Sequence, residues 1–298
     1  MLLADFINGS ISRLAPLYPV KEARSIVLML CAHFIGTKSY THIVEPEYGI
    51  PESKLPVLEE GVERLSAGEP VQYVIGEAEF YDHKFRVTPD VLIPRPETEL
   101  LCREAIGIGS RIYRMRQAYG KKAWPVRILD LCTGSGCIAW TLALSVPSAE
   151  VIGVDLSEPA LEIAKSQAFA EELKAAGASA PEFVQADVLD TEGDFGRGEF
   201  DLILSNPPYI MDKEKPDLRR NLGFEPESAL FVPDDDPLVF YRAIAQWSRR
   251  YLTPEGSGLT EINELLGPET VACFKEAGFS AEIIKDFYNK NRFVLYHR

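Results

Sequence analysis

The stretch VRILDLCTGSG, residues Val126–Gly136, decides the fold of this chain. Its first six residues form a short apolar run bounded by turn residues, which is typical of a buried strand. The apolar segment CIAWTLALS, residues 137–145, follows and is predicted to be a helix. Glycines in a turn let the backbone approach a ligand closely, and the start of a helix offers free N–H groups. We therefore expect Thr133, Gly134, Ser135 and Gly136 to form a ligand-binding loop.

The same alternation of strand and helix continues along the chain. Strands are predicted at residues 151–154, 183–186, 202–204 and 258–262, and helices at residues 159–176 and 237–251. Ser157 is the expected N-cap of the first of these helices. Residues 279–287 and 292–296 are predicted to close the chain as a hairpin. Alternating strands and helices imply an α/β fold with a parallel, doubly wound sheet.

Two aspartates follow predicted strands of this sheet. Asp155 ends the second strand, nineteen positions after Gly136, and Asp187 ends the third. Ligands of doubly wound sheets bind outside the carboxyl ends of the strands. The Asp155 carboxylate is therefore placed to accept both hydroxyls of a ribose, and Asp187 to accept from an adenine amino group.

A proline-braced corner, Ser205-Asn206-Pro207-Pro208-Tyr209, follows the next apolar run. Neither proline can donate to a strand ladder, and each has a fixed φ, so the strand must end there. Pro207 also keeps Asn206 out of the helical region. The corner can direct two carbonyl oxygens outward beside an aromatic ring, an arrangement that holds an –NH2 group. The alternative interpretation is a rigid turn without chemistry.

Two cofactor classes fit the glycine loop. Gly134-x-Gly136-x-x-Ala139 matches the GxGxxA pattern of nicotinamide dehydrogenases, with Asp155 at a suitable distance. However, no Tyr-Lys or His-Asp catalytic pair is evident, and a dehydrogenase has no use for the corner at Asn206. The loop and the corner together favour a methyltransferase that uses S-adenosyl-L-methionine and acts on nitrogen.

Composition narrows the class of protein and of partner. The 298 residues suffice for two domains, and a formal charge of −14 argues against duplex nucleic acid as the main partner. The five cysteines contain no CxxC pair and the four histidines no metal-ligand spacing, so we expect reduced thiols and no metal site. No segment resembles a signal peptide, and the longest apolar run, residues 26–35, is too short to span a bilayer. We expect a cytoplasmic protein.

The remaining segments carry less chemistry. Residues 1–70 show apolar positions at helical spacing with prolines at the connections, which predicts a small helical module that packs against a partner or a second domain. Aromatic and β-branched residues at 71–93 predict a hairpin that joins two domains. Residues 100–124 include a basic stretch, which we interpret as a solvated helix face rather than an RNA-contacting patch. Its basic residues are Arg111, Arg114, Arg116, Lys121 and Lys122, with Tyr113 and Tyr119 interleaved.

Five sequence blocks resemble the release factor glutamine methyltransferases (the HemK/PrmC family). They are EPVQYVIG (69–76), LIPRPETE (92–99), ILDLCTGSG (128–136), SNPPYI (205–210) and FEPESAL (224–230). The combination of IPRPETE with NPPY is highly specific, whereas NPPY alone is shared with enzymes that methylate adenine amino groups. The resemblance covers residues 69 to 298, with a compatible helical segment before them.

The resemblance implies an organisation and an activity. It implies a helical, partner-binding domain at 1–70, a β-hairpin linker at 71–94 and a seven-stranded, Rossmann-like methyltransferase domain at 95–298. The implied substrate is the glutamine of the Gly-Gly-Gln motif in peptide chain release factors, methylated on its side-chain amide nitrogen in translation termination. No direct nucleic acid substrate and no membrane are implied, and we expect a monomer.

The resemblance also implies roles for individual residues. Asn206, Pro207, Pro208 and Tyr209 correspond to the catalytic corner. The cofactor would be bound by Cys132, Thr133, Gly134, Ser135, Gly136, Asp155, Asp187, Val188 and Asn206. Arg95, Thr98 and Glu225 are candidates for positioning the substrate or the methyl donor.

This chain departs from the family pattern at two positions. Cys132 stands where the family usually has glycine, and Glu261-Ile262-Asn263 replaces the usual Glu-Ile-Gly. Both departures concern loop geometry and leave the corner intact. Two rival functions stay open at this point: a methyltransferase acting on adenine amino groups of nucleic acid, and a cofactor-binding protein without catalysis.

Overall fold

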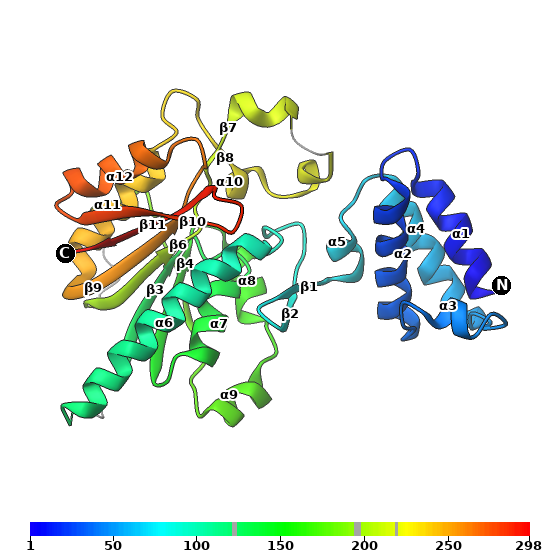
Figure 1. The fold of residues 1–298 in the computed structure, drawn as a ribbon, viewed down its shortest axis with the longest axis horizontal. Coiled ribbons are helices and arrows are strands. Elements are labelled where there is room, and N and C mark those ends of the chain that lie inside the picture. Colours follow the sequence, from blue (N-terminus) through cyan, green and yellow to red (C-terminus); the bar gives the residue numbers. More distant parts are fainter. Residues whose placement is uncertain (121–123, 194–197, 218–219) are drawn as a thin grey trace. The chain divides into compact units, whose positions relative to one another are not determined.

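The computed structural model describes residues 1–120, 124–193, 198–217 and 220–298 and contains two compact units (Figure 1). The first unit comprises Met1–Glu77 together with the short 3-10 helix η3 (Arg220–Phe224). The second contains the rest of the described chain. None of the helices in the described ranges is both long and apolar enough to cross a membrane.

The first unit is helical, as predicted for residues 1–70. Its elements are α1 (Leu3–Leu14), α2 (Val20–Ile35), α3 (Thr41–Val44), η1 (Glu52–Lys54), α4 (Leu55–Ser66) and α5 (Val71–Ile75). Aliphatic and aromatic side chains from one stripe of each longer helix form its core, among them Phe6, Leu30 and Leu58. Apolar burial between amphipathic helices therefore stabilises this unit.

The prediction of a hairpin from residue 71 onward was wrong for its first five residues, which form α5. The Pro70 carbonyl accepts from the N–H of Val74 at 3.1 Å, and Val71 and Val74 pack into the helical core. Gly76, at φ 78°, ends the helix in the left-handed region. Core packing thus outweighs the strand preference of these β-branched residues. The hairpin itself follows as β1 (Glu77–Phe80) and β2 (His83–Arg86).

The second unit is built on a seven-stranded sheet, which confirms the predicted doubly wound fold. Its order is β10-β11-β9-β6-β3-β4-β5, in which β11 is antiparallel to both of its neighbours and the other pairs are parallel. The strands are β3 (Val126–Leu131), β4 (Ala149–Asp155), β5 (Glu182–Gln185), β6 (Phe200–Ser205), β9 (Leu252–Glu261), β10 (Ser280–Lys285) and β11 (Asn291–His297).

Helices cover both faces of this sheet. Because side chains alternate along a strand, Ile128 packs with α6 (Pro96–Ala118) and α7 (Cys137–Ser145) on one face. Leu129 packs with α11 (Val239–Tyr251) and α12 (Gly267–Glu276) on the other. Between β6 and α11 the second unit also contains a segment with β7 (Ile210–Met211), η2 (Asp212–Asp217), α10 (Glu227–Leu230) and β8 (Phe231–Val232), here called the excursion.

The alanine-rich segment 159–176 forms two helices, not the single one predicted. They are α8 (Glu158–Lys165), capped by Ser157 as expected, and α9 (Ala170–Ala176). Between them, the Gln167 side chain bonds to both the N–H and the carbonyl of Arg86 at 2.9 and 3.0 Å, and to the carbonyl of Ser135 at 3.1 Å. These long-range bonds connect Gln167, where the helix is interrupted, to β2 and to the glycine loop. Helical periodicity in the sequence cannot reveal such bonds.

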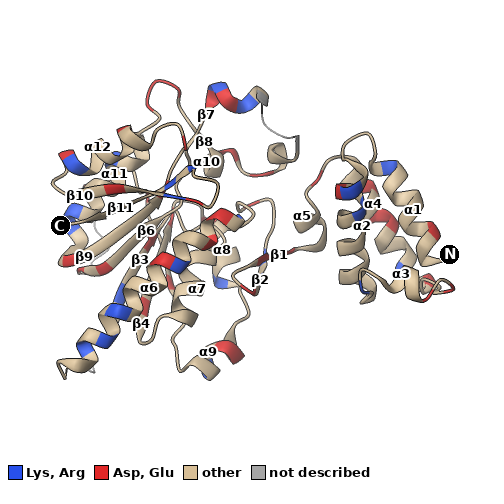
Figure 2. Cartoon of the chain, viewed as in Figure 1, with Lys and Arg blue, Asp and Glu red and all other residues tan. Residues whose placement is uncertain are grey.

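The basic stretch lies on α6, whose last turns carry several basic side chains (Figure 2). Arg111 and Arg114 are exposed, in line with a solvated face. Arg116 instead donates two hydrogen bonds to the buried Asp201, at 2.9 and 2.6 Å. Lys121 and Lys122 lie outside the described residues.

Arg116→Ala is expected to lower the free energy of unfolding by about 2 kcal/mol. Among the described residues, the substitution leaves the buried Asp201 carboxylate with the N–H of Arg127 as its remaining donor, at 2.9 Å. An uncompensated buried charge costs roughly 3–5 kcal/mol when both partners are fully buried. Arg116 is partly exposed, which reduces the loss. Urea unfolding measures it. Arg114→Ala, two positions earlier on the same helix and exposed, is the control, and equal effects of both substitutions would contradict the assignment.

Candidate active site

A cleft of about 380 Å³ lies in the second unit at the carboxyl ends of its parallel strands. Because β4 and β5 lie on one side of β3 while β6 lies on the other, the strand order reverses between β3 and β6, the place where such folds bind ligands. Most of the predicted site residues line the cleft: Arg95, Thr98, Cys132, Thr133, Gly134, Ser135, Asp155, Asp187, Val188, Asn206 and Pro208. Pro207, Tyr209, Gly136 and Glu225 are not among its lining residues.

The glycine loop is held by the carboxylate of Asp155. One oxygen of Asp155 accepts from the N–H of Gly134 at 2.8 Å, and the other accepts from the N–H of Ser157 at 2.9 Å. Gly134 and Gly136 have φ of 53° and 78°, a left-handed conformation that glycine adopts without strain. A Cβ on Gly136 would come within 3.0–3.1 Å of Phe183, Ala164 and Trp140. The loop therefore requires glycine at this position for close packing.

The corner after β6 is joined to β3 and to α6. The Ser205 hydroxyl donates to the carbonyl of Leu131 at 2.8 Å, so the ends of the two strands are tied together. The amide nitrogen of Asn206 donates to the Thr98 hydroxyl at 3.2 Å. Asn206 thus lines the cleft with one N–H of its NH2 group bonded to Thr98.

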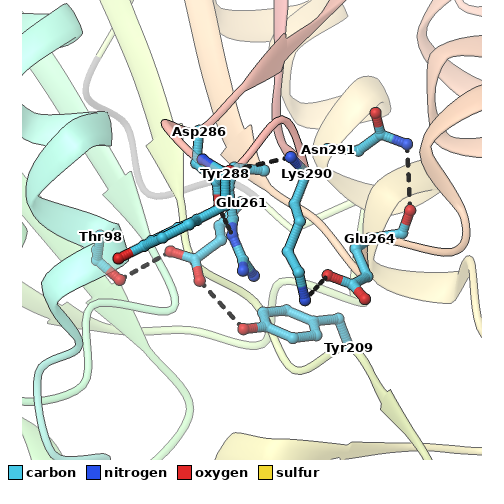
Figure 3. A network of polar contacts seen from close by, with 9 residues as sticks. Thr98, Tyr209, Glu261, Glu264, Asp286, Tyr288, Lys290 and Asn291 are labelled. Carbon is cyan, nitrogen blue, oxygen red and sulfur yellow. Dashed lines mark hydrogen bonds and ion pairs between the residues drawn. The ribbon is translucent and has the colours of Figure 1, made fainter.

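Tyr209 and Glu225 support the cleft from outside its wall. The Tyr209 hydroxyl donates to Glu261 at 3.1 Å (Figure 3), and burial raises the pKa of Tyr209 well above its ordinary value, which keeps the hydroxyl protonated. That the Tyr209 ring covers a substrate amide stays a prediction. The buried Glu225 accepts from Arg95 at 2.6 Å and from the N–H of Ile93 at 3.0 Å. It therefore fixes Arg95 at the cleft.

Comparisons with known proteins agree with this geometry. A family model described as "PrmC N-terminal domain" matches residues 6–76, and one described as "Methyltransferase domain" matches residues 128–222. The chain is 34% identical to the release factor glutamine methyltransferase of Flavobacterium psychrophilum, over 99% of this chain and 98% of that one. It is 36% identical to the enzyme of the same name from Bacteroides thetaiotaomicron, over 96% of each. The chain belongs to the release factor glutamine methyltransferase family.

Membership in this family makes the chain an S-adenosyl-L-methionine-dependent methyltransferase, and the cleft fits that cofactor. A Cβ on Gly134 would meet no atom within 4 Å, so there is open space for a ligand against the loop. The Asp155 carboxylate has about four acceptor positions. The N–H groups of Gly134, Ser157 and Leu156 take up three of them, so one remains for a hydroxyl. Leu156 and Leu189 line the cleft with exposed apolar side chains that could cover a flat base. Single apolar residues after a strand carry no local signal, so the sequence did not single them out.

Cys132, the first departure from the family pattern, has a strained backbone. Its φ is 61°, a conformation that costs a residue with a Cβ roughly 1–2 kcal/mol. Its side chain lines the cleft, and burial raises the pKa of its thiol well above the ordinary value. The thiol is therefore an uncharged part of the cleft lining. A glycine at this position would adopt the same backbone without strain.

Cys132→Gly is therefore expected to stabilise the enzyme by about 1 kcal/mol, measured as a rise in the urea midpoint at constant slope. Cys132→Ala is the matched control, because it removes the thiol but keeps the Cβ that causes the strain. A stability gain for the alanine variant as large as for the glycine variant would show that the thiol, and not the backbone, is responsible.

Asn263, the second departure, connects the corner to the excursion that follows it. Its amide nitrogen donates to the carbonyl of Tyr209 and to the carboxylate of Glu214, both at 3.1 Å. Glu214 in turn accepts from the N–H of Met211 at 2.8 Å. Glycine could make none of these side-chain bonds. The replacement thus adds a support for the exit of the corner.

A buried carboxyl group lies beneath the glycine loop. Asp130 accepts from the Thr133 hydroxyl at 2.5 Å, while its other oxygen has no partner among the described residues. Burial raises the pKa of Asp130 to about 7, with Asp155 adding to the effect. The folded state therefore favours the protonated form of Asp130 more than the unfolded state does.

This raised pKa predicts a pH-dependent stability. Between about pH 4 and pH 7 the folded protein binds more protons at Asp130 than the unfolded chain, so stability falls with rising pH, by up to about 1.4 kcal/mol per unit. The loss is complete above the folded-state pKa. Asp130→Asn keeps an acceptor for Thr133 but does not titrate. We expect the difference in unfolding free energy between variant and wild type to increase from pH 5 to pH 8. Parallel pH curves would contradict this.

Proposed function

We propose that this enzyme methylates the side-chain amide nitrogen of a glutamine in a peptide chain release factor, the glutamine of the Gly-Gly-Gln motif. The relatives that bear this activity in their name align with nearly the whole chain. The observation that supports the proposal most directly is the place of Asn206, which lines the same cleft as the glycine loop. An acceptor for an amide NH2 group is thus available beside the cofactor site.

The residues of the corner can activate a poor nucleophile by orientation. An amide nitrogen is weakly nucleophilic because its lone pair is delocalised into the carbonyl group. The side-chain oxygen of Asn206 and the backbone oxygen of Pro207 would each accept one N–H, which aims the nitrogen at the donor. Bound S-adenosyl-L-methionine supplies an electrophilic methyl group. Correct positioning of reacting groups can contribute on the order of 7–11 kcal/mol to lowering the barrier.

The same two oxygens would stabilise the transition state. As the nitrogen forms its bond to carbon it gains positive charge, and its N–H groups become stronger donors. Fixed acceptors then bind the transition state more tightly than the ground state. The nitrogen loses a proton after transfer, so a strong base is not required in the cleft.

The proposal extends to the remaining parts of the chain. We assign the helical residues 1–70 to binding of the release factor, together with α5, which packs into their core. The linker is then shorter than the expected residues 71–94 and starts after α5, and we assign residues 95–298 to catalysis. We further infer that the enzyme acts in the cytoplasm as a monomer and does not take nucleic acid as a direct substrate. The five free cysteines are consistent with a reducing compartment, and the formal charge of −14 argues against nucleic acid as the substrate.

Asn206→Ala is expected to lower turnover by about 100-fold while cofactor affinity changes little, because loss of one oriented transition-state partner costs roughly 10²–10³ in rate. Mass spectrometry of a purified release factor measures the added methyl group at the Gly-Gly-Gln glutamine, and calorimetry measures cofactor binding. Turnover at the wild-type level would refute the role of Asn206. Methylation of DNA or RNA instead of the release factor would favour an adenine amino methyltransferase, and cofactor binding without any product a non-catalytic protein.

A further inference from the structure

A chain of buried hydrogen bonds extends from Asn206 to the end of β9. The Asn206 amide nitrogen donates to the Thr98 hydroxyl at 3.2 Å, and this hydroxyl donates to Oε2 of Glu261 at 2.7 Å. Oε1 of the same carboxylate accepts from the Tyr209 hydroxyl (Figure 3). Thr98 and Glu261 are each only 1% exposed, so water does not replace these bonds. One carboxylate thus supports both ends of the Asn206–Tyr209 corner.

The number of hydrogen atoms available for bonding determines which group donates and which accepts in each of these hydrogen bonds. An ionised carboxylate can only accept, so the single hydroxyl hydrogen of Thr98 must go to Glu261. The Thr98 oxygen is then left as an acceptor, and only the NH2 end of Asn206 can bond to it. The carbonyl oxygen of Asn206 is consequently the end that is free to accept from a ligand. This conclusion does not depend on which atom of the Asn206 side chain is assigned as oxygen and which as nitrogen, because it follows from the donors and acceptors around it.

The geometry supports an ionised carboxylate, because each oxygen of Glu261 accepts from a hydroxyl group, Thr98 at 2.7 Å and Tyr209 at 3.1 Å. Burial and the charge of Glu97 raise the pKa of Glu261 above its ordinary value, while these two hydroxyls and the positive charge of Arg292 act in the opposite direction. Arg292 lies on β11, the neighbour of β9, and is itself held by Asp286 at 2.9 Å. Two hydroxyl donors and a nearby guanidinium group together compensate for much of the missing solvation.

We propose that Glu261 is a positioning residue that sets, through Thr98, which end of the Asn206 amide is presented to the substrate. The inference rests on the proposed function, in which Asn206 must act as an acceptor. Without Glu261 the Thr98 hydroxyl could donate to Asn206 instead. Asn206 would then present its NH2 group to the NH2 group of the substrate, and two donors would face each other.

A nearly isosteric substitution tests this directly. In Glu261→Gln the new amide can donate to the Thr98 oxygen. The Thr98 hydroxyl hydrogen then points toward Asn206, so the direction of these hydrogen bonds is reversed. Its oxygen can still accept from Tyr209. Thr98→Val keeps the shape of the side chain but removes the relay, and Thr98→Ser keeps the hydroxyl. We expect the first two variants to lose about 100-fold in kcat with cofactor affinity within about threefold of wild type, and Thr98→Ser to recover most of the loss.

A double-mutant cycle separates positioning from packing. If Glu261 acts through Asn206, then Glu261→Gln combined with Asn206→Ala is no slower than Asn206→Ala alone. Additive losses in the cycle, wild-type kcat in Glu261→Gln, or a Thr98→Ser variant as slow as Thr98→Val would each overturn the proposal.

A readout without turnover distinguishes failure of this inference from failure of the proposed function. The side-chain NH2 signal of Asn206 in an NMR spectrum is identified by its loss in Asn206→Ala. In wild type it should be protected from solvent exchange by its bond to buried Thr98, and in Glu261→Gln and Thr98→Val the protection should disappear. An unprotected signal in wild type would overturn the inference even if the release factor is methylated. Protection that is lost as expected would support it even if another amide or amine is the substrate.

Discussion

The parallel pairing of β3 with β6 is the constraint on which the site depends. It places Leu131 beside Ser205, and the bond from the Ser205 hydroxyl to the Leu131 carbonyl closes the end of the pair. The glycine loop follows Leu131 within two residues and the proline-braced corner begins at Ser205, although more than seventy positions separate them in the chain. Methyl transfer requires donor and acceptor within van der Waals distance. Strand register alone therefore brings the two halves of the chemistry together.

Carboxylates in and behind the walls of the cleft maintain its shape. Asp155 holds the N–H of Gly134, Glu225 holds Arg95, and Glu261 holds Thr98 and Tyr209. Asp130 holds the Thr133 hydroxyl in the same way. Burial of each carboxylate opposes folding, and at least two donors offset that cost at Asp155, Glu225 and Glu261, whereas one oxygen of Asp130 has no partner among the described residues. Some of the acidic residues of this chain thus have a structural role around the cleft, which the net charge alone does not reveal.

Local patterns predicted most of the fold, and long-range contacts explain the errors. The bounds of α7 and the Ser157 cap follow from nearby residues and were confirmed. The helix break at Gln167 depends on bonds to residue 86, and α5 depends on packing within the helical core. In the site, the glycine loop and the corner have recognisable motifs. The Thr98–Glu261 bond spans 163 positions and has no sequence signature, so only the folded structure reveals it.

The two departures from the family pattern have opposite physical consequences. Cys132 adds strain at the glycine loop, because a Cβ is forced into a left-handed backbone. Asn263 adds bonds at the corner, because its amide holds the Tyr209 carbonyl and Glu214. The preorganisation that catalysis needs is that of the acceptor oxygens, since they must be in place when charge develops on nitrogen. Additional support at the corner therefore serves the chemistry directly, whereas the cofactor loop can tolerate strain as long as Asp155 and Gly134 remain bonded.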